Sequence, residues 1–359
     1  MHSPAEYHLI RETKELIDFI PKWRKLIERD PVATPFQSAE WLVPWWRHFG
    51  GVELCAVTIA RGEEIVGFLP FYVYHDVTKL QRQLLPLGVG TTDYLDGVFA
   101  PECSTGEIGR AVEWVRGRVS HDVFCATQLR GESRLLEAME QGTAGTDKGS
   151  GIEQREPEVF MSPSQACSRM KASMIWDLPQ KIRRNAMYYR NRALRCGSLE
   201  LVQADASNWE KLFAELIRLH TLRWKSRGEE GVLGDERVVA WHREAVPQLL
   251  NAGWLRLMAL RLNDEIIAVL YSLVDRSRER RTQYFYITSY SVEHGSLRPG
   301  TLLIAYAAEH AAREGVATID MLRGDEGYKQ VWHMEKFPTW CCTRFANSRA
   351  NSDREETAA

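Results

Sequence analysis

The pattern of apolar residues predicts the same strand, turn and strand in both halves of the chain. Leu54 to Val73 aligns without gaps to Leu255 to Val274, at an offset of 201 residues. Gly62 in one turn, and Asn263 with Asp264 in the other, tolerate the positive φ that hairpin turns need. Helical patterns precede the two hairpins, at Phe36 to Phe49 and at Asn208 to Arg227. We therefore favour a duplication into two related domains over a chance alignment of two common hairpins.

A junction rich in polar residues lies near the end of the second half. Val316 to Leu322 reads as a short apolar strand, and Gly324 permits a sharp turn into a helix through Trp332. Four side chains would gather at the carboxyl end of this strand, where open α/β sheets place their ligands: Arg323, Asp325, Tyr328 and Lys329. The purely structural alternative is an N-cap at Asp325, an ion pair of Asp320 with Arg323, and core contacts of Tyr328 with Trp332.

Composition and charge are those of a soluble globular protein. The 359 residues suffice for two ordinary domains, and 44% hydrophobic with 26% charged residues is typical of a packed core under a polar surface. The formal net charge of −2 argues against stable binding of nucleic acid by the protein as a whole. No stretch approaches the roughly 18 apolar residues of a membrane span, and the charged N-terminus is unlike a signal peptide. We therefore expect a cytoplasmic protein.

Cysteine and histidine usage gives no sign of a disulfide framework or a metal site. The seven cysteines include no Cys-x-x-Cys pair, which predicts reduced structural thiols. The ten histidines show no metal-ligand spacing, so we expect no metal.

Gly-rich and charged stretches suggest where the domains end. Residues 142–158 are poor in apolar side chains and predict a surface loop or connection, and Ser173 to Leu178 reads as a further strand. We predict an N-terminal domain over residues 1–160, a C-terminal domain over 161–346 and a disordered tail over 347–359.

Two motifs resemble a known family. The pattern Arg-Gly-Asp-x-x-Tyr-Lys-x-x-Trp, from Arg323 to Trp332, is similar to that of the CelD/BcsL acetyltransferases of cellulose and exopolysaccharide loci. These belong to the GNAT superfamily, of which the FemAB-type peptidyl transferases are more distant relatives. Gly88 to Asp96 resembles a second pattern of the family, Gly-x-x-x-x-Asp-Tyr-x-Asp. The resemblance implies an α/β (α+β) fold of two tandem GNAT-like domains, each a mixed, mainly antiparallel sheet flanked by helices.

The resemblance also implies a binding site for an acyl-CoA donor. The turn from Ser296 to Thr301 occupies the place of the GNAT phosphate loop, because backbone N–H groups at a helix N-terminus bind anions. It departs from the usual pattern by having a single glycine. The strand before it would pair its free backbone edge with pantetheine. The predicted donor contacts are Tyr286, Ile287, Arg298, Gly300 and Thr301.

Catalytic and acceptor residues follow from the same family patterns. We predict Tyr328 as the general acid for the leaving thiolate and His220 as a general base. Lys329 would neutralise developing oxyanion charge or hold an anionic group of a substrate. A packed helix histidine is the structural alternative for His220. The predicted substrate contacts are Asp93, Tyr94, Asp96, Arg223, Arg323 and Asp325. A basic segment, Lys181 to Arg195, is either a solvated helix face or a rim for phosphate-bearing substrates.

These features predict an acyl-CoA-dependent N- or O-acyltransferase, most simply an acetyltransferase, acting on a saccharide or related small molecule in exopolysaccharide biosynthesis. A FemAB-like transferase that uses aminoacyl-tRNA is one alternative. A non-catalytic GNAT-like binding or assembly protein is the other, supported by the single-glycine phosphate loop. The acceptor and the oligomeric state are left open by the sequence.

Overall fold

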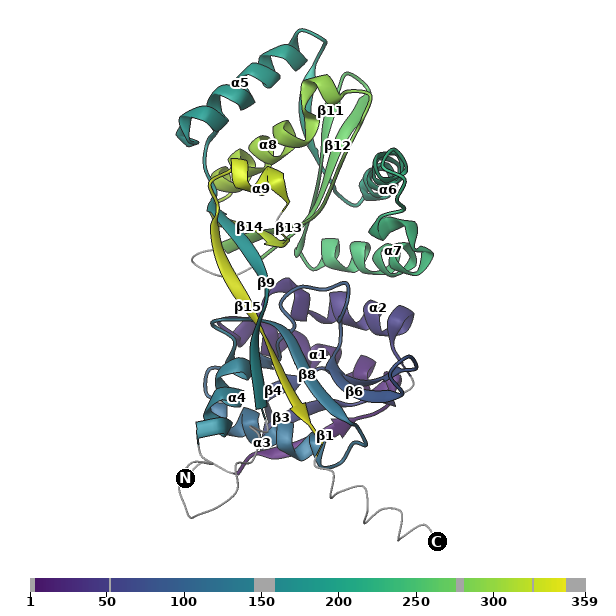
Figure 1. The fold of residues 1–359 in the computed structure, drawn as a ribbon, viewed down its shortest axis with the longest axis vertical. Helices are drawn as coiled ribbons and strands as arrows, with labels where there is room; N and C mark the ends of the chain where they lie inside the picture. Colours follow the sequence, from purple (N-terminus) through teal and green to yellow (C-terminus); the bar gives the residue numbers. More distant parts are fainter. Residues whose placement is uncertain (1–3, 52, 145–158, 276–280, 325, 347–359) are drawn as a thin grey trace. The chain divides into compact units, whose positions relative to one another are not determined.

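The computed structural model describes residues 4–51, 53–144, 159–275, 281–324 and 326–346. These fall into two compact units: unit 1 is Met1–Gln165 with Pro338–Ala359, and unit 2 is Ala166–Phe337 (Figure 1). Two long strands, β9 (Val159–Lys171) and β15 (Glu335–Phe345), run from one unit into the other. Three segments of the sequence analysis lie outside the described residues: Asp325, the predicted tail, and most of the loop predicted over 142–158. The first three residues of that loop, 142–144, form the end of a helix.

Unit 1 contains two sheets and four α-helices among its described residues. Its elements are β1 (Glu6–Ile10), α1 (Thr13–Arg29), η1 (Pro35–Gln37), α2 (Ala39–Phe49), β2 (Glu53–Leu54), β3 (Ala56–Arg61), β4 (Glu64–Leu69), β5 (Phe71–Asp76), β6 (Gln81–Pro86), β7 (Val98–Phe99), α3 (Thr105–Arg116), β8 (Val123–Arg130) and α4 (Arg134–Ala144). One sheet has the order β1-β3-β4-β7. In the other, β2, β5, β6, β8 and the last part of β15 are neighbours, and only β6 and β8 pair in parallel.

Unit 2 is built around a single sheet. Its elements are η2 (Ile175–Asp177), α5 (Gln180–Leu194), β10 (Leu199–Gln203), α6 (Trp209–Lys225), η3 (Val232–Gly234), α7 (Glu236–Asn251), β11 (Leu255–Leu262), β12 (Glu265–Val274), β13 (Arg281–Tyr290), η4 (Gly295–Leu297), α8 (Pro299–Arg313), β14 (Val316–Arg323) and α9 (Gly327–Val331). The strand order is β10-β11-β12-β13-β14, followed by the end of β9. Helices α5 and α8 cover one face of this sheet, and α6 and α7 cover the other (Figure 1). The segment predicted as a strand over Ser173 to Leu178 contains the short helix η2 instead.

The duplicated hairpin has the same register in both units. Val57 pairs with Leu69 in unit 1, and Met258 pairs with Leu270, 201 positions later, in unit 2. A β-bulge follows Ile59 in the first hairpin and Leu260 in the second, again at the same offset. In both units a preceding strand pairs antiparallel with the first hairpin strand, β1 with β3 and β10 with β11. The two halves therefore share a topology as well as a sequence pattern.

A second repeat links the strands that follow α3 and α8. Strands β8 and β14 are each eight residues long, and both end in Leu-Arg followed by Gly, at 129–131 and 322–324. Each pairs in parallel with an earlier strand of its own unit, β8 with β6 and β14 with β13. This three-residue match is too short to be found without the topology, but it supports the same duplication.

The seven cysteines are all free thiols. In the part of the chain that the structure describes, no helix is long and apolar enough to cross a membrane, and no group of three or more potential metal ligands is found.

Candidate active site

Strands β13 and β14 separate at the end of unit 2 where the predicted site lies. Their parallel pairing covers only Arg281–Tyr284 of β13, opposite Val316–Asp320 of β14. From Ile287 to Tyr290, β13 stays paired with β12 but has no β14 partner among the described residues. The two strands diverge toward the start of α8, which begins at Pro299 (Figure 1). An opened parallel pair leaves backbone N–H and C=O groups available to an extended ligand.

Arg223 of α6 reaches this opened end of β13. Its guanidinium donates to the carbonyl oxygen of Thr288 at 3.2 Å and lies 4.4 Å from the ring centre of Tyr290. The same charge is close enough to Tyr328 to oppose the rise of its pKa. The structure thus brings together the predicted residues Arg223 and Tyr328. It adds Tyr290, which the sequence analysis missed, although this tyrosine continues the aromatic alternation of the strand.

Tyr328 is on the short helix α9 and is 42% exposed. Loss of hydration, followed by the negative charge of Glu326, raises the pKa of its hydroxyl above the usual 10. The hydroxyl is protonated at neutral pH, as it would be at its usual pKa, and the raised pKa makes it a weaker proton donor. Tyr328 is thus partly exposed, whereas Trp332, its partner in the structural alternative, is buried.

His220 lies one turn before Arg223 on α6 and is only 3% exposed. Its Nδ1 has no hydrogen-bond partner within the described structure, and its ring packs 5.8 Å from that of Trp224. Burial, with a smaller effect of Arg223, lowers the pKa of the imidazole to about 4. His220 is thus neutral at pH 7 and able to accept a proton, but it is a weaker base than an exposed histidine.

The ammonium of Lys329 is committed to protein oxygens. Nζ donates to the carbonyls of Leu322 at 3.3 Å, Arg323 at 2.8 Å and Gly324 at 3.3 Å, and it lies 2.9 Å from Glu326 Oε2. The side chain is only 2% exposed. An ammonium has three hydrogens, so these contacts use its full donor capacity. The geometry favours a lysine that holds the turn after β14 over one that is free to contact a substrate.

The turn held by Lys329 has an unusual backbone. Leu322 has φ +58° and Gly324 has φ +108°, and the pairing of β14 with β9 is irregular between Asp320 and Arg323. Left-handed φ is uncommon for leucine, which indicates that surrounding contacts impose it. Asp320 is fully buried and pairs with Arg169 at 2.9 Å, a partner that the sequence analysis did not name.

The predicted phosphate loop leads into the start of helix α8, but its glycine, Gly300, makes room for a side chain of the protein. Arg298 adopts a left-handed conformation (φ 50°, ψ 54°) as the N-cap residue, and Pro299 begins α8. A Cβ on Gly300 would lie 2.9 Å from the ring of Tyr290. The missing side chain of Gly300 therefore makes room for Tyr290. Thr301 is the third residue of the helix and is half-buried.

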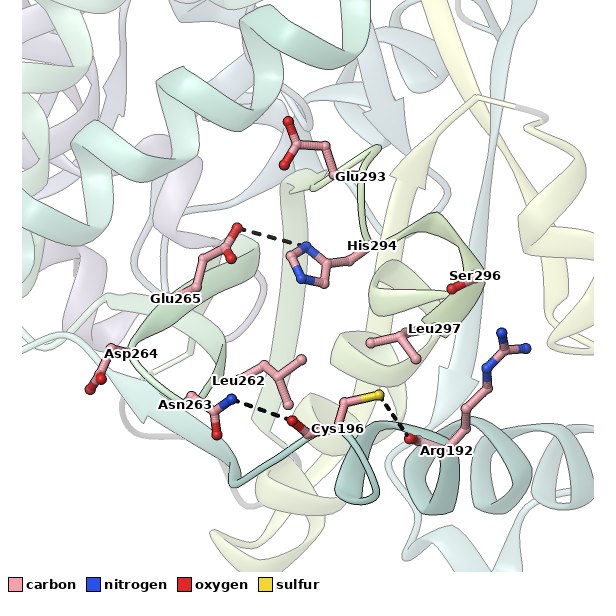
Figure 2. Close-up of a pocket in the computed structure, with 10 residues that line it drawn as sticks. All are labelled: Arg192, Cys196, Leu262, Asn263, Asp264, Glu265, Glu293, His294, Ser296 and Leu297. Atoms are coloured by element: carbon pink, nitrogen blue, oxygen red, sulfur yellow. Dashed lines mark hydrogen bonds and ion pairs between the residues drawn. The ribbon is translucent and has the colours of Figure 1, made fainter.

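An open pocket of about 690 Å³ adjoins this loop (Figure 2). Carboxylates of Asp264, Glu265 and Glu293 line one part of it, and His294 Nδ1 lies 3.7 Å from Glu265 Oε1. Arg192 lies on the opposite side. None of the predicted donor contacts lines the pocket. Its acidic rim is a poor match for phosphate, so the opened edge of β13 is the better candidate for donor binding.

The other two predicted donor contacts lie along β13. The ring of Tyr286 is 5.6 Å from those of His242 and Tyr271, on the side of the sheet covered by α7, and Ile287 is buried. Their side chains thus serve packing. The separation of β13 from β14 leaves the backbone of this segment, and not these side chains, available to a ligand.

The predicted substrate contacts of unit 1 form a separate group in the loop between β6 and β7. Asp93 and Tyr94 are buried, and burial raises the pKa of Asp96 to about 6. Indole N–H groups of Trp41 and Trp45 donate to Thr92 Oγ1 at 2.9 Å and Thr91 Oγ1 at 2.8 Å. These buried tryptophans therefore hold the loop from within the core.

Comparisons with known proteins agree with this geometry. Residues 180–330 match the family model described as acetyltransferase (GNAT) domain. No curated protein matches the chain. Among solved structures, FemX is similar over 97% of this chain and 99% of its own, with 10% identity and a TM-score of 0.61. L-PGS from Bacillus licheniformis is similar over 92% and 94%, with 11% identity and a TM-score of 0.56.

A third solved structure has the same fold. The C-terminal domain of a putative lysylphosphatidylglycerol synthetase from Agrobacterium fabrum covers 96% of both chains, with 11% identity and a TM-score of 0.55. At such identities the likeness shows the fold alone. Together with the repeated topology, it confirms the predicted mixed α/β fold of two tandem GNAT-like domains. Residues 180–330, which match the acetyltransferase (GNAT) domain model, lie in unit 2, and this match indicates acyltransferase activity.

Proposed function

We propose that this chain is an acyl-CoA-dependent N- or O-acyltransferase of the CelD/BcsL type. It moves an acyl group, most simply acetyl, to a saccharide or related metabolite in a cytoplasmic step of exopolysaccharide biosynthesis. In this proposal residues 161–346 bind the donor and residues 1–160 contribute the acceptor side. The observation that carries the proposal is the separation of β13 from β14 beside the start of α8, within a matched acetyltransferase domain.

The residues around the opened strand fit an acyl-thioester donor. The free edge of β13 from Tyr286 to Tyr290 supplies backbone groups for the amides of pantetheine, and Arg298 at the start of α8 is an exposed cation for the phosphates. Acyl-CoA supplies the activated acyl group and the thiolate that leaves. Arg223 supplies positive charge next to Tyr328 and Tyr290.

Proton transfer is assigned to groups with suitable protonation at neutral pH. Tyr328 carries its proton and donates it to the leaving thiolate. Neutral His220 is available to accept a proton from the acceptor, directly or through water. Lys329 contributes by holding the Leu322–Gly324 turn from which α9 and Tyr328 follow.

Calorimetry with coenzyme A tests the donor assignment. We expect binding to the full chain, weakened by Arg298→Gln and unchanged by Arg243→Gln, because Arg243 is an exposed arginine of α7 away from the loop. Incubation with labelled acetyl-CoA and a cell extract, read by mass spectrometry, then identifies the acceptor. Absence of binding at millimolar coenzyme A would remove the acyl-CoA proposal.

A second candidate function, transfer from aminoacyl-tRNA, is favoured by one observation. The segment of α5 and the residue after it has six cations: Lys181, Arg183, Arg184, Arg190, Arg192 and Arg195. None of them forms an ion pair in the described structure, whereas many arginines elsewhere are paired. Such a concentration of charge suits a polyanion. A thermal shift with tRNA and none with coenzyme A would favour this candidate, and no shift with either would favour a binding or assembly protein.

A further inference from the structure

Two of the seven cysteines meet although they are 216 residues apart in sequence. The Sγ atoms of Cys125 on β8 and Cys341 on β15 are 3.4 Å apart, and both residues belong to unit 1. Thr343 Oγ1 lies 3.6 Å from Cys341 Sγ and 3.8 Å from Cys125 Sγ. Both cysteines are partly exposed, so small reagents have access to the pair.

The pairing of the two strands explains why these thiols meet. Thr343 lies directly opposite Cys125, and the register shifts between Trp340 and Cys342. Across this irregularity, Gln128 of β8 has φ +58°. A bulge of this kind bends a strand and re-aims a side chain. Here it leaves Cys341 beside Cys125 and turns the adjacent Cys342 into the core, where it is fully buried.

We propose that Cys125 and Cys341 are a redox-active pair that forms a reversible disulfide across β8 and β15. The oxidant is a low-molecular-weight disulfide of the glutathione class. The Cys341 thiolate attacks one sulfur of the oxidant and releases one thiol, and Cys125 loses its proton and attacks the sulfur of Cys341, releasing the second. Two protein thiols are oxidised and one small disulfide is reduced to two thiols.

The electrostatics of the pair give the two sulfurs different roles. The contact with Cys125 lowers the pKa of Cys341, and the same contact, with burial, raises the pKa of Cys125. Cys341 is therefore the attacking sulfur and Cys125 the resolving one. By contrast, burial raises the pKa of Cys55, Cys103 and Cys342 to about 12, which makes them unreactive.

The required movement is small. A disulfide bond is about 2.05 Å long, so the two sulfurs must approach each other by about 1.4 Å for the bond to form. The bond would enclose the whole of unit 2 between its two cysteines. Cross-links that enclose long segments restrict the unfolded chain most, so oxidation should stabilise the protein against unfolding.

Equilibration of the full-length native protein with glutathione and glutathione disulfide tests the proposal. We expect a loss of about 2 Da in the intact mass and a cross-linked peptide containing Cys125 and Cys341. The thermal midpoint should rise by about 5 °C or more and return on reduction. Cys342→Ser and Cys196→Ser should keep the cross-link, and Cys125→Ser should stop at a glutathione adduct on Cys341.

Alkylation provides a second measurement that does not depend on a variant folding. Limiting iodoacetamide should label Cys341 of the native protein before Cys342, and this labelling should prevent the cross-link. The proposal is overturned if Cys341 forms a stable mixed disulfide in the unmodified protein without conversion to the Cys125 bond. It is equally overturned if the mapped disulfide contains Cys342.

Discussion

Replacing Lys329 by methionine separates a structural role of this lysine from a chemical one. Methionine keeps an unbranched side chain of similar length but removes the ammonium that contacts three carbonyls and Glu326. If the ammonium mainly holds the turn after β14, its loss should lower the free energy of unfolding of unit 2. If it mainly contacts a substrate, stability should change little.

The structure gives the expected magnitude. A hydrogen bond to a charged group contributes about 1.5–3 kcal/mol, and removing the donor of a buried set leaves its acceptors unsatisfied. Glu326 is 54% exposed and regains water, so its ion pair adds little. We expect a loss of about 3 kcal/mol, because the three bonds share one ammonium and are not additive. For a domain of this size that is a fall of about 6–12 °C in the thermal midpoint.

Differential scanning calorimetry of Lys329→Met against two controls measures this effect. Lys211→Met removes an exposed lysine of α6, and Glu326→Gln removes only the half-exposed ion pair. Both controls should stay within about 2 °C of the unaltered protein. A Lys329→Met protein with an unchanged midpoint but greatly reduced transfer activity would refute the structural argument and return the ammonium to the chemistry.

Three further predictions concern the residues around this site. Gly231 has φ +68°, and a Cβ there would lie 2.4 Å from His220 Cε1, so Gly231→Ala should lower the free energy of unfolding by more than about 2 kcal/mol. Gly228 has φ +76° but open space around it, so Gly228→Ala should lower this free energy by only about 1 kcal/mol. Urea denaturation of the two variants measures the difference. The pKa of His220 is about 4 in the folded protein, so the unfolded chain binds the proton first as the pH falls. The free energy of unfolding should therefore decrease between about pH 6.5 and pH 4. His220→Gln should make this decrease smaller in denaturation experiments carried out across the same pH range. Tyr328→Phe should lower turnover by about 10²–10⁴ with little change in donor binding, and unaltered turnover in steady-state kinetics would exclude it as the acid.

The parts of the fold that the sequence predicted depend on local patterns. The two hairpins were found because a tight turn fixes the register of its strands, and the paired registers then agree position for position. The strand over Val316 to Leu322 and the helix over Asn208 to Arg227 were also predicted nearly to their ends. The prediction of a strand from Ser173 to Leu178 was wrong because a short apolar run does not distinguish a strand from a short helical turn.

Contacts between distant segments explain what the sequence could not predict. Nothing local to Gly300 indicates that its missing Cβ accommodates Tyr290, and nothing local to Asp320 indicates Arg169 as its partner. The meeting of Cys125 with Cys341 depends on a bulge in a pairing between strands more than two hundred residues apart. The family motif identified Lys329 as a residue of interest, but only the structure shows which oxygens its ammonium contacts.

The Leu-Arg-Gly sequence is repeated at the ends of β8 and β14, but the two arginines make different contacts in the two units. In unit 1 the guanidinium of Arg130 lies 5.2 Å from the ring centre of buried Tyr94, so the loop after β6 folds back onto the end of β8. In unit 2 the carbonyl of Arg323 is held by Lys329, and Tyr290 instead contacts Arg223 of α6. Buried Tyr94 packs against Arg130 at the strand end of unit 1, whereas β13 and β14 of unit 2 separate beside the start of α8, and we therefore propose that acyl transfer takes place in unit 2.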